Sequence, residues 1–227
     1  MPASIPDSLN TLSAGLILIA AFAILGTRQV QGIVRFFVIQ SALLAASCFL
    51  LGYSENSVHL WALGAITVGA KVIAIRIVLR RLLPGDYYER REVTQAVNIP
   101  SSLLLALLLT VFAEFLAGPV AATTQNLVVR VNLPIGLACL LIGAYSLVAR
   151  REAIPQLIGI LAMENGAFFA GIAVAPELPL IAELAIAVDI VLIVVVVGLL
   201  TRTIRQEVGI TEAAALRELK EEPVEWR

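Results

Sequence analysis

Long apolar stretches, separated by short polar breaks, run along almost the whole chain. A helix that crosses the hydrocarbon core of a bilayer needs about 20 predominantly apolar residues. Stretches of that length occur at residues 9–27, 31–52, 58–82, 97–118, 128–149, 154–175 and 178–202. Gly118 and Pro119 are expected to end the fourth stretch, because glycine and proline punctuate helices. The pattern therefore predicts an all-α integral membrane protein with seven transmembrane helices.

Composition agrees with a membrane protein and narrows the chemistry that this chain can perform. Of its 227 residues 59% are hydrophobic, the mean hydropathy is +0.94, and charged residues make up 15%, against about 25% in soluble domains. Two cysteines lie inside apolar stretches, and there is one histidine. These three side chains are too few to hold a zinc, haem or iron–sulfur site within this chain alone. We therefore expect no cofactor, no metal and no catalytic residue here.

Basic residues gather in alternate loops. One set of loops and the C-terminal tail contain Arg28, Arg80, Arg81, Arg90, Arg91, Arg150, Arg151, Arg202, Arg205, Arg217, Lys220 and Arg227, whereas the alternate loops contain only Arg130. By the positive-inside rule the first set is cytoplasmic. The N-terminus is then outside and the C-terminus inside, which agrees with an odd number of spans. A bacterial or archaeal cytoplasmic membrane is the expected location.

The spans follow a repeated plan. In each triplet the second helix carries a polar residue near its middle, Gln40 or Glu164, and the third carries one charge, Lys71 or Asp189. Four spans separate equivalent helices, so the two triplets are predicted to be parallel in the membrane. The segments are a first three-helix repeat at 1–83, a cytoplasmic loop and connector helix at 84–120, a second repeat at 121–205 and a cytoplasmic tail at 206–227.

Polar and charged residues within the apolar stretches are the candidate functional residues. A carboxylate at the depth of Glu164 costs roughly 2.5–3.5 kcal/mol on insertion scales, so such residues mark functional sites by default. The comparable positions are Lys71, Asp189, Gln40 and Glu114, with Glu183 on the helix of Asp189.

Two interpretations of these residues stay open. In the first, Lys71 forms an ion pair with Asp189 or Glu164 across the triplet interface, which lowers the insertion cost of both partners. In the second, the carboxylates form a proton relay. Burial disfavours their charged form and a nearby ammonium favours it, so a balanced group can load and release a proton at neutral pH.

Residues 150–205 resemble the three-helix K subunit of respiratory complex I. The parallel lies in the sequence from Arg150 to Gly159, in Glu164-Asn-Gly and in Asp189 on the next helix. Nearly the whole chain is similar to component E of the hydrogenase-4 and formate hydrogenlyase-2 complexes, through its length, its Met-Glu-Asn-Gly sixth helix and its Lys-bearing third helix.

The resemblance implies a lateral proton path lined by two buried acids. Asp189 matches the acid on the third helix of the K subunit. Its second-helix acid corresponds to Leu161, so Glu164, three residues later on the same face, is the substitute. In the first repeat these positions are Gln40 and Lys71, so that copy departs further from the pattern.

We therefore expect a noncatalytic membrane subunit of a complex-I-like energy-converting oxidoreductase that contributes buried charges to a proton or sodium path. The partners implied by the resemblance are antiporter-like membrane subunits, a membrane anchor subunit and peripheral subunits with iron–sulfur clusters or a hydrogenase-like site, with no nucleic acid. The alternatives are a stand-alone ion transporter and a purely structural scaffold subunit of the membrane arm.

Overall fold

The computed structural model describes residues 5–77 and 97–175, and every element in these ranges is a helix. The elements are α1 (Ile5–Gly26), α2 (Val30–Ser54), α3 (Val58–Thr67), the π-helical segment η1 (Val68–Ala74) that continues α3, α6 (Ile99–Thr123), α7 (Leu127–Ala149) and α8 (Ala153–Val174). Six helices in the described ranges are long and apolar enough to cross a membrane, with α3 and η1 acting as one helix to Ile77. Each of these helices overlaps one of the first six predicted spans, and residues 78–82 of the third predicted span lie outside the described residues. The seventh span, at 178–202, lies outside the described residues.

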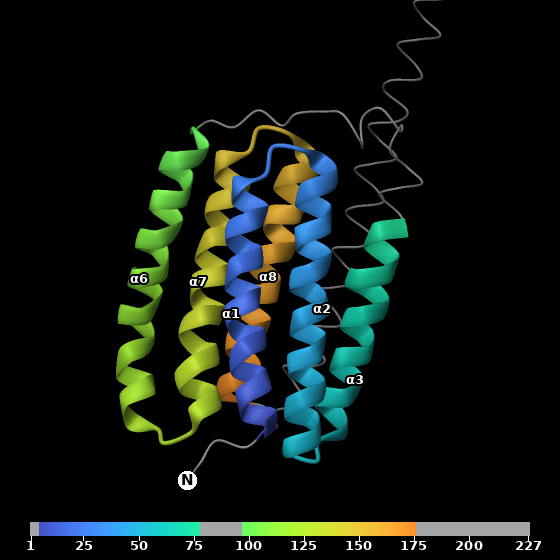
Figure 1. Ribbon diagram of the computed structural model, residues 1–227, viewed down its shortest axis with the longest axis vertical. Coiled ribbons are helices and arrows are strands. Elements are labelled where there is room, and N and C mark those ends of the chain that lie inside the picture. The colour runs from blue at the N-terminus through green and yellow to red at the C-terminus, as the bar shows by residue number, and fades with distance from the viewer. Residues whose placement is uncertain (1–4, 78–96, 176–227) are drawn as a thin grey trace, which may run out of the picture.

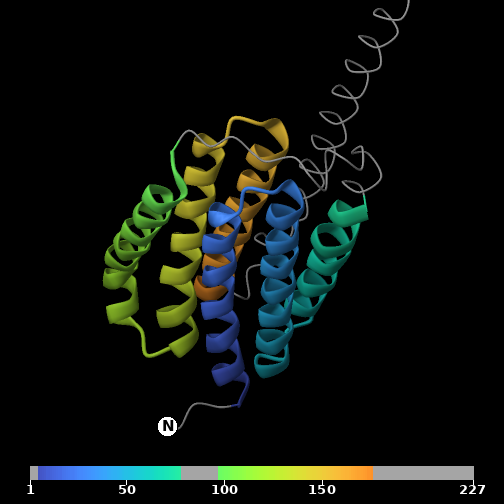
Figure 2. The same ribbon diagram turned by 45° about the horizontal axis from the view of Figure 1, so that its top comes forward.

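Four helices form the centre of the bundle. The hairpin of α1 and α2 packs against the hairpin of α7 and α8, with α1 beside α7 and α2 beside α8 (Figure 1). Helix α3 lies outside α2, and α6 lies outside α7, as the rotated view in Figure 2 also shows. Helices α1 and α7 run in the same direction, and so do α2 and α8. The polar positions on these four helices are therefore brought toward one another.

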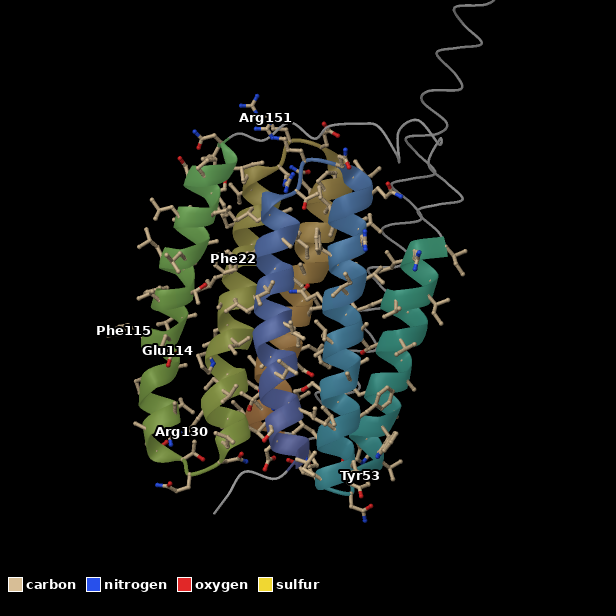
Figure 3. The ribbon with its side chains drawn as sticks, in the orientation of Figure 1. Phe22, Tyr53, Glu114, Phe115, Arg130 and Arg151 are labelled. Atoms are coloured by element: carbon tan, nitrogen blue, oxygen red, sulfur yellow. The ribbon has the colours of Figure 1, made fainter. Side chains whose placement is uncertain are left out.

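The described loops carry their charges as the sequence pattern predicts. The connections between α1 and α2 and between α7 and α8 lie at one end of the bundle and contain Arg28 and Arg151. Figure 3 shows Arg151 at this end, and Tyr53 and Arg130 at the other. The orientation of these two ends in a membrane stays a prediction.

The expectation that Gly118 and Pro119 end the fourth helix is wrong. Helix α6 continues through both residues to Thr123. A proline in the interior of a helix removes one hydrogen bond to the preceding turn, but membrane helices tolerate it when neighbouring groups satisfy the freed carbonyl. Pro119 lies close to the C-terminal end of α6, so most of the helix is unaffected by the lost bond.

Arg150, at the C-terminal end of α7, turns inward and caps α1. Its Nη2 atom donates hydrogen bonds to the backbone oxygens of Ile24, Leu25 and Thr27, at 2.9, 3.0 and 3.0 Å. The last carbonyls of a helix have no intrahelical partner, and a cation there also interacts favourably with the helix dipole. Burial lowers the pKa of Arg150 to about 10, an effect that nearby Glu152 partly offsets. The guanidinium is therefore still protonated at neutral pH and joins the two hairpins.

Glycines allow α7 and α8 to approach each other closely. A Cβ atom added to Gly166 would lie 2.3 Å from the backbone nitrogen of Leu140, and one added to Gly143 would lie 2.4 Å from that of Met163. Both contacts are with backbone atoms, which cannot move aside as the end of a flexible side chain can. The close approach places the polar residues of α8 against the centre of the bundle.

We expect Gly166→Ala to lower the stability of the bundle by about 1–3 kcal/mol, because the added methyl group overpacks the interface of α7 and α8. Thermal unfolding in detergent, followed by intrinsic fluorescence, measures the effect. Gly15→Ala is the matched control, since a Cβ atom there meets nothing within 4 Å. Equal unfolding temperatures for the two variants would contradict the packing described here.

Candidate functional site

An ion pair between Lys71 and Glu164 lies at the centre of the bundle. The Nζ atom of Lys71, in η1, is 3.2 Å from Oε1 of Glu164, in α8, and the exposed fractions of the two side chains are 2% and 10%. Glu164 is eleven residues from the start of α8, about 16 Å along the axis at 1.5 Å per residue. The pair therefore lies near half the length of a membrane-spanning helix.

Three neutral polar side chains extend the ion pair toward α2. Lys71 donates a hydrogen bond of 3.1 Å to Oδ1 of Asn165. The amide nitrogen of Asn165 donates in turn to Oγ of Ser41, at 2.9 Å, and to Oε1 of Gln40, at 3.4 Å. Asn165, Gln40 and Ser41 are each at most 1% exposed. Helices α2 and α8 and segment η1 thus meet in one continuous polar network, which we call the Lys71 network.

The helix that carries Lys71 changes its winding at this residue. Val68–Ala74 form a π-helix, with Lys71 at its centre. Single π-helical turns inside α-helices are rare and occur frequently at functional sites. The wider turn rotates the positions that follow it relative to a regular α-helix. The direction of Lys71 therefore depends on this irregularity as well as on the sequence spacing.

An aromatic ring supports the ammonium group on another side. Nζ of Lys71 lies 5.5 Å from the centroid of the Phe168 ring, one turn beyond Glu164 on α8. A cation over an aromatic face gains about 0.5–1 kcal/mol at exposed sites and more when it is desolvated. Lys71 is thus held by an anion, an amide oxygen and a ring, all from α8.

This arrangement can couple proton binding to a structural change. A buried ion pair is stable only while both groups are charged and well placed, because each charge alone carries a large desolvation cost. A proton that reaches Glu164 removes the attraction on Lys71 and frees the ammonium for another acceptor. The amide and hydroxyl groups of the Lys71 network have no charge to change, so they position the pair.

The structure brings together three of the six candidate residues. Lys71, Glu164 and Gln40 belong to the Lys71 network. Glu114 does not, because it lies on an exposed face of α6. Asp189 and Glu183 lie outside the described residues. Of the two ion pairs that the sequence left open for Lys71, the one with Glu164 is present. Within the described ranges, no group of three or more His, Cys, Asp and Glu side chains is placed to hold a metal ion.

A second polar cluster was not predicted. Asn10 of α1 and Asn132 of α7 donate amide hydrogen bonds to each other, at 3.0 and 3.3 Å, and Ser47 of α2 donates to Oδ1 of Asn10. Asn132 follows Asn10 by 122 residues, close to the offset of 124 residues that relates Gln40 to Glu164. That shared offset is the signal that could have identified the two asparagines from the sequence.

A double-mutant cycle tests whether Lys71 and Glu164 form a coupled pair. We expect Lys71→Met alone to destabilise the protein by about 3–5 kcal/mol, because it leaves a buried carboxylate without its cation. Lys71→Met combined with Glu164→Leu is expected to regain most of that loss, because removing both charges of a buried pair is often neutral. Thermal unfolding in detergent measures all variants.

Lys71→Met combined with Asp189→Leu is the comparator for this cycle. If this combination, and not the one with Glu164→Leu, restored stability, Asp189 would be the partner of Lys71. Strictly additive losses in both combinations would show that Lys71 is coupled to neither carboxylate.

The chain matches other proteins over almost its full length. It is 24% identical over 217 residues to hydrogenase-4 component E of Escherichia coli, covering 91% of this chain and 95% of the relative, and the same protein of Shigella flexneri matches equally. It is thus distantly related to that membrane component. It is 30% identical over 209 residues to the uncharacterized protein Rv0085 of Mycobacterium tuberculosis, covering 92% and 94% of the two chains. No protein-family model and no solved structure matches. The chain therefore belongs to the same family as the uncharacterized protein Rv0085 of Mycobacterium tuberculosis.

Proposed function

We propose that this chain is a noncatalytic membrane subunit of a complex-I-like energy-converting oxidoreductase of the hydrogenase-4 type, and that it contributes a buried charge pair to a proton or sodium path. The observation that carries the proposal is the ion pair of Lys71 and Glu164 near the middle of the bundle. The distant relation to hydrogenase-4 component E over nearly the whole chain supports membership of a multi-subunit complex.

The cost of the ion pair supports a role beyond packing. Two ions in a low-dielectric environment are often no more stable than well-packed apolar side chains of the same volume. Charged residues inside membrane proteins mark ion and proton paths for that reason. The neutral members of the Lys71 network add hydrogen bonds that fix where the pair lies.

In the proposed mechanism Glu164 receives a proton from a neighbouring group or a water chain. Its ion pair with Lys71 then breaks, and the ammonium is free to attract the next anionic group. Loss of the proton restores the pair. Each cycle moves one positive charge past the centre of the bundle, and the direction is set by the groups on either side. If sodium is the coupling ion, it neutralises the same carboxylate.

The repeated plan of the two triplets is part of this proposal. Contacts between the hairpins join residues at almost constant offsets: 122 residues for Asn10 and Asn132, and 124 for Ser41 and Asn165. The asparagines also donate to each other reciprocally, as residues beside a two-fold axis do. These contacts support two parallel repeats with an axis between α1 and α7. The ion pair then joins the third helix of one repeat to the second helix of the other.

We expect Glu164→Gln to lower ion translocation by the reconstituted complex by at least about tenfold, because a positioned proton-transfer group contributes at least that factor. The redox activity of the peripheral subunits should persist, since Glu164 lies far inside the bundle. Ion uptake into liposomes and electron-transfer rate are measured on the same preparation. Glu55→Gln, which alters an exposed carboxylate at the end of α2, is the control.

Two outcomes would favour the alternatives. Wild-type translocation by the Glu164→Gln complex, with normal assembly, would make the chain a scaffold subunit whose charges only pair. Purification of the chain without other subunits, together with ion transport by the lone protein in liposomes, would make it a stand-alone transporter.

A further inference from the structure

Helix α6 is attached to the bundle by a narrow stripe of small residues. Ser102, Ala106, Ala113 and Ala117 are its buried residues, and they recur at the spacing of one helix face. The Ser102 hydroxyl lies 3.0 Å from that of Tyr145, a hydrogen bond between α6 and α7. In the most apolar 18 residues of α6 the buried share is 17%, whereas in those of α8 it is 67%. Most of the circumference of α6 is therefore left uncovered by the other described helices.

The open side of α6 is an apolar face that contains one acid. Leu104, Leu107, Val111 and Phe115 are 60%, 53%, 62% and 76% exposed, and Glu114 is exposed beside them. At 3.6 residues per turn, Leu104, Val111 and Phe115 lie opposite the small-residue stripe, and Leu107 and Glu114 lie along one edge of the same face. Figure 3 shows Glu114 on α6, with Phe115 pointing away from the bundle.

Glu114 lies too deep for water to solvate it easily. It precedes the end of α6 at Thr123 by nine residues, about 13 Å along the helix axis. Among the described residues it makes no hydrogen bond and no ion pair. A carboxylate facing lipid at that depth is costly, whereas a cationic side chain on a neighbouring helix would reduce the cost.

Among the described residues, no lysine, arginine or histidine forms an ion pair with Glu114. The remaining apolar stretch, residues 178–202, has one basic residue, Arg202, at its very end, and brings two further acids, Glu183 and Asp189. Lys71 is already paired with Glu164. A second copy that met this face across a two-fold axis would place Glu114 against its own counterpart, and like charges repel.

We propose that the face of α6 formed by Leu104, Leu107, Val111, Glu114 and Phe115 is the docking surface for a transmembrane helix of a different subunit, and that this helix carries a lysine or arginine at the depth of Glu114. The inference rests on the proposed membership of a multi-subunit membrane complex, but it is independent of ion conduction by the Lys71 network. The apolar residues supply packing area, and the ion pair selects the partner and fixes its register.

Photo-crosslinking in the native membrane tests the docking surface. A benzoylphenylalanine residue at Val111, in the full chain expressed with its complex, should crosslink to an apolar segment of another subunit that contains a mid-span lysine or arginine. Glu114→Lys should lower the crosslinking yield at least tenfold, and a glutamate in place of the partner's basic residue should restore it. Glu114→Leu is the folding control, because it removes the charge without introducing one of the opposite sign.

The possible results separate this inference from the proposed function. A Val111 crosslink to lipid alone, in a complex whose other subunits still co-purify, would overturn the docking surface only. A crosslink to a second copy of this chain, or to a segment without a basic residue, would also overturn it. A chain that purifies with no other subunit would instead contradict the proposed membership of a complex. An unchanged yield for Glu114→Lys would show that charge plays no part.

Discussion

The absence of water inside a bilayer is the constraint on which this structure depends. Every polar side chain between the helices must find a partner in the protein. The residues of the Lys71 network, and Asn10 with Asn132, find theirs across helix interfaces, whereas Thr110 donates to a carbonyl of its own helix. The ion pair of Lys71 and Glu164 is the most demanding case, because each charge is costly without the other. The Lys71 network as a whole requires η1, α8 and α2 to meet at one depth.

Polar contacts hold the central hairpins together at three levels. Arg150 caps the last turn of α1 at one end of the bundle, and the Lys71 network lies near the middle. The reciprocal amides of Asn10 and Asn132 lie toward the other end. Between these levels the contacts are apolar, and glycines bring α7 and α8 close together. Such directional contacts specify which helices are neighbours, whereas apolar packing alone would allow several arrangements.

Much of the fold could be predicted from the sequence, because a membrane-spanning helix can be recognised from its length and hydropathy alone. The first six stretches and their breaks at Arg28 and Arg150 correspond to the helices and loops of the structure. Helix ends were less predictable: Pro119 lies within α6, because a proline near a helix end disrupts few hydrogen bonds.

The candidate site could be predicted only in part. Charged residues are unusual in apolar stretches, so Lys71 and Glu164 could be identified as candidates and their pairing could be anticipated. Their contact, however, depends on helix rotation and on the π-helical turn at Lys71. Sequence spacing alone could not show that Glu114 lies apart from the Lys71 network, because the exposure of Glu114 depends on how α6 packs. Asn10 and Asn132 were not predicted, because a neutral amide near the end of a span does not by itself indicate a polar cluster.

The proposed ion path requires Glu164 to change its protonation state while the complex works. Infrared difference spectroscopy during redox turnover of the reconstituted complex measures this directly, because a protonated carboxyl group has a carbonyl band that a carboxylate lacks. We predict such a band in the wild type, its loss in Glu164→Gln and its retention in Glu55→Gln. A difference spectrum of the Glu164→Gln complex identical to that of the wild type would contradict proton transfer at Glu164.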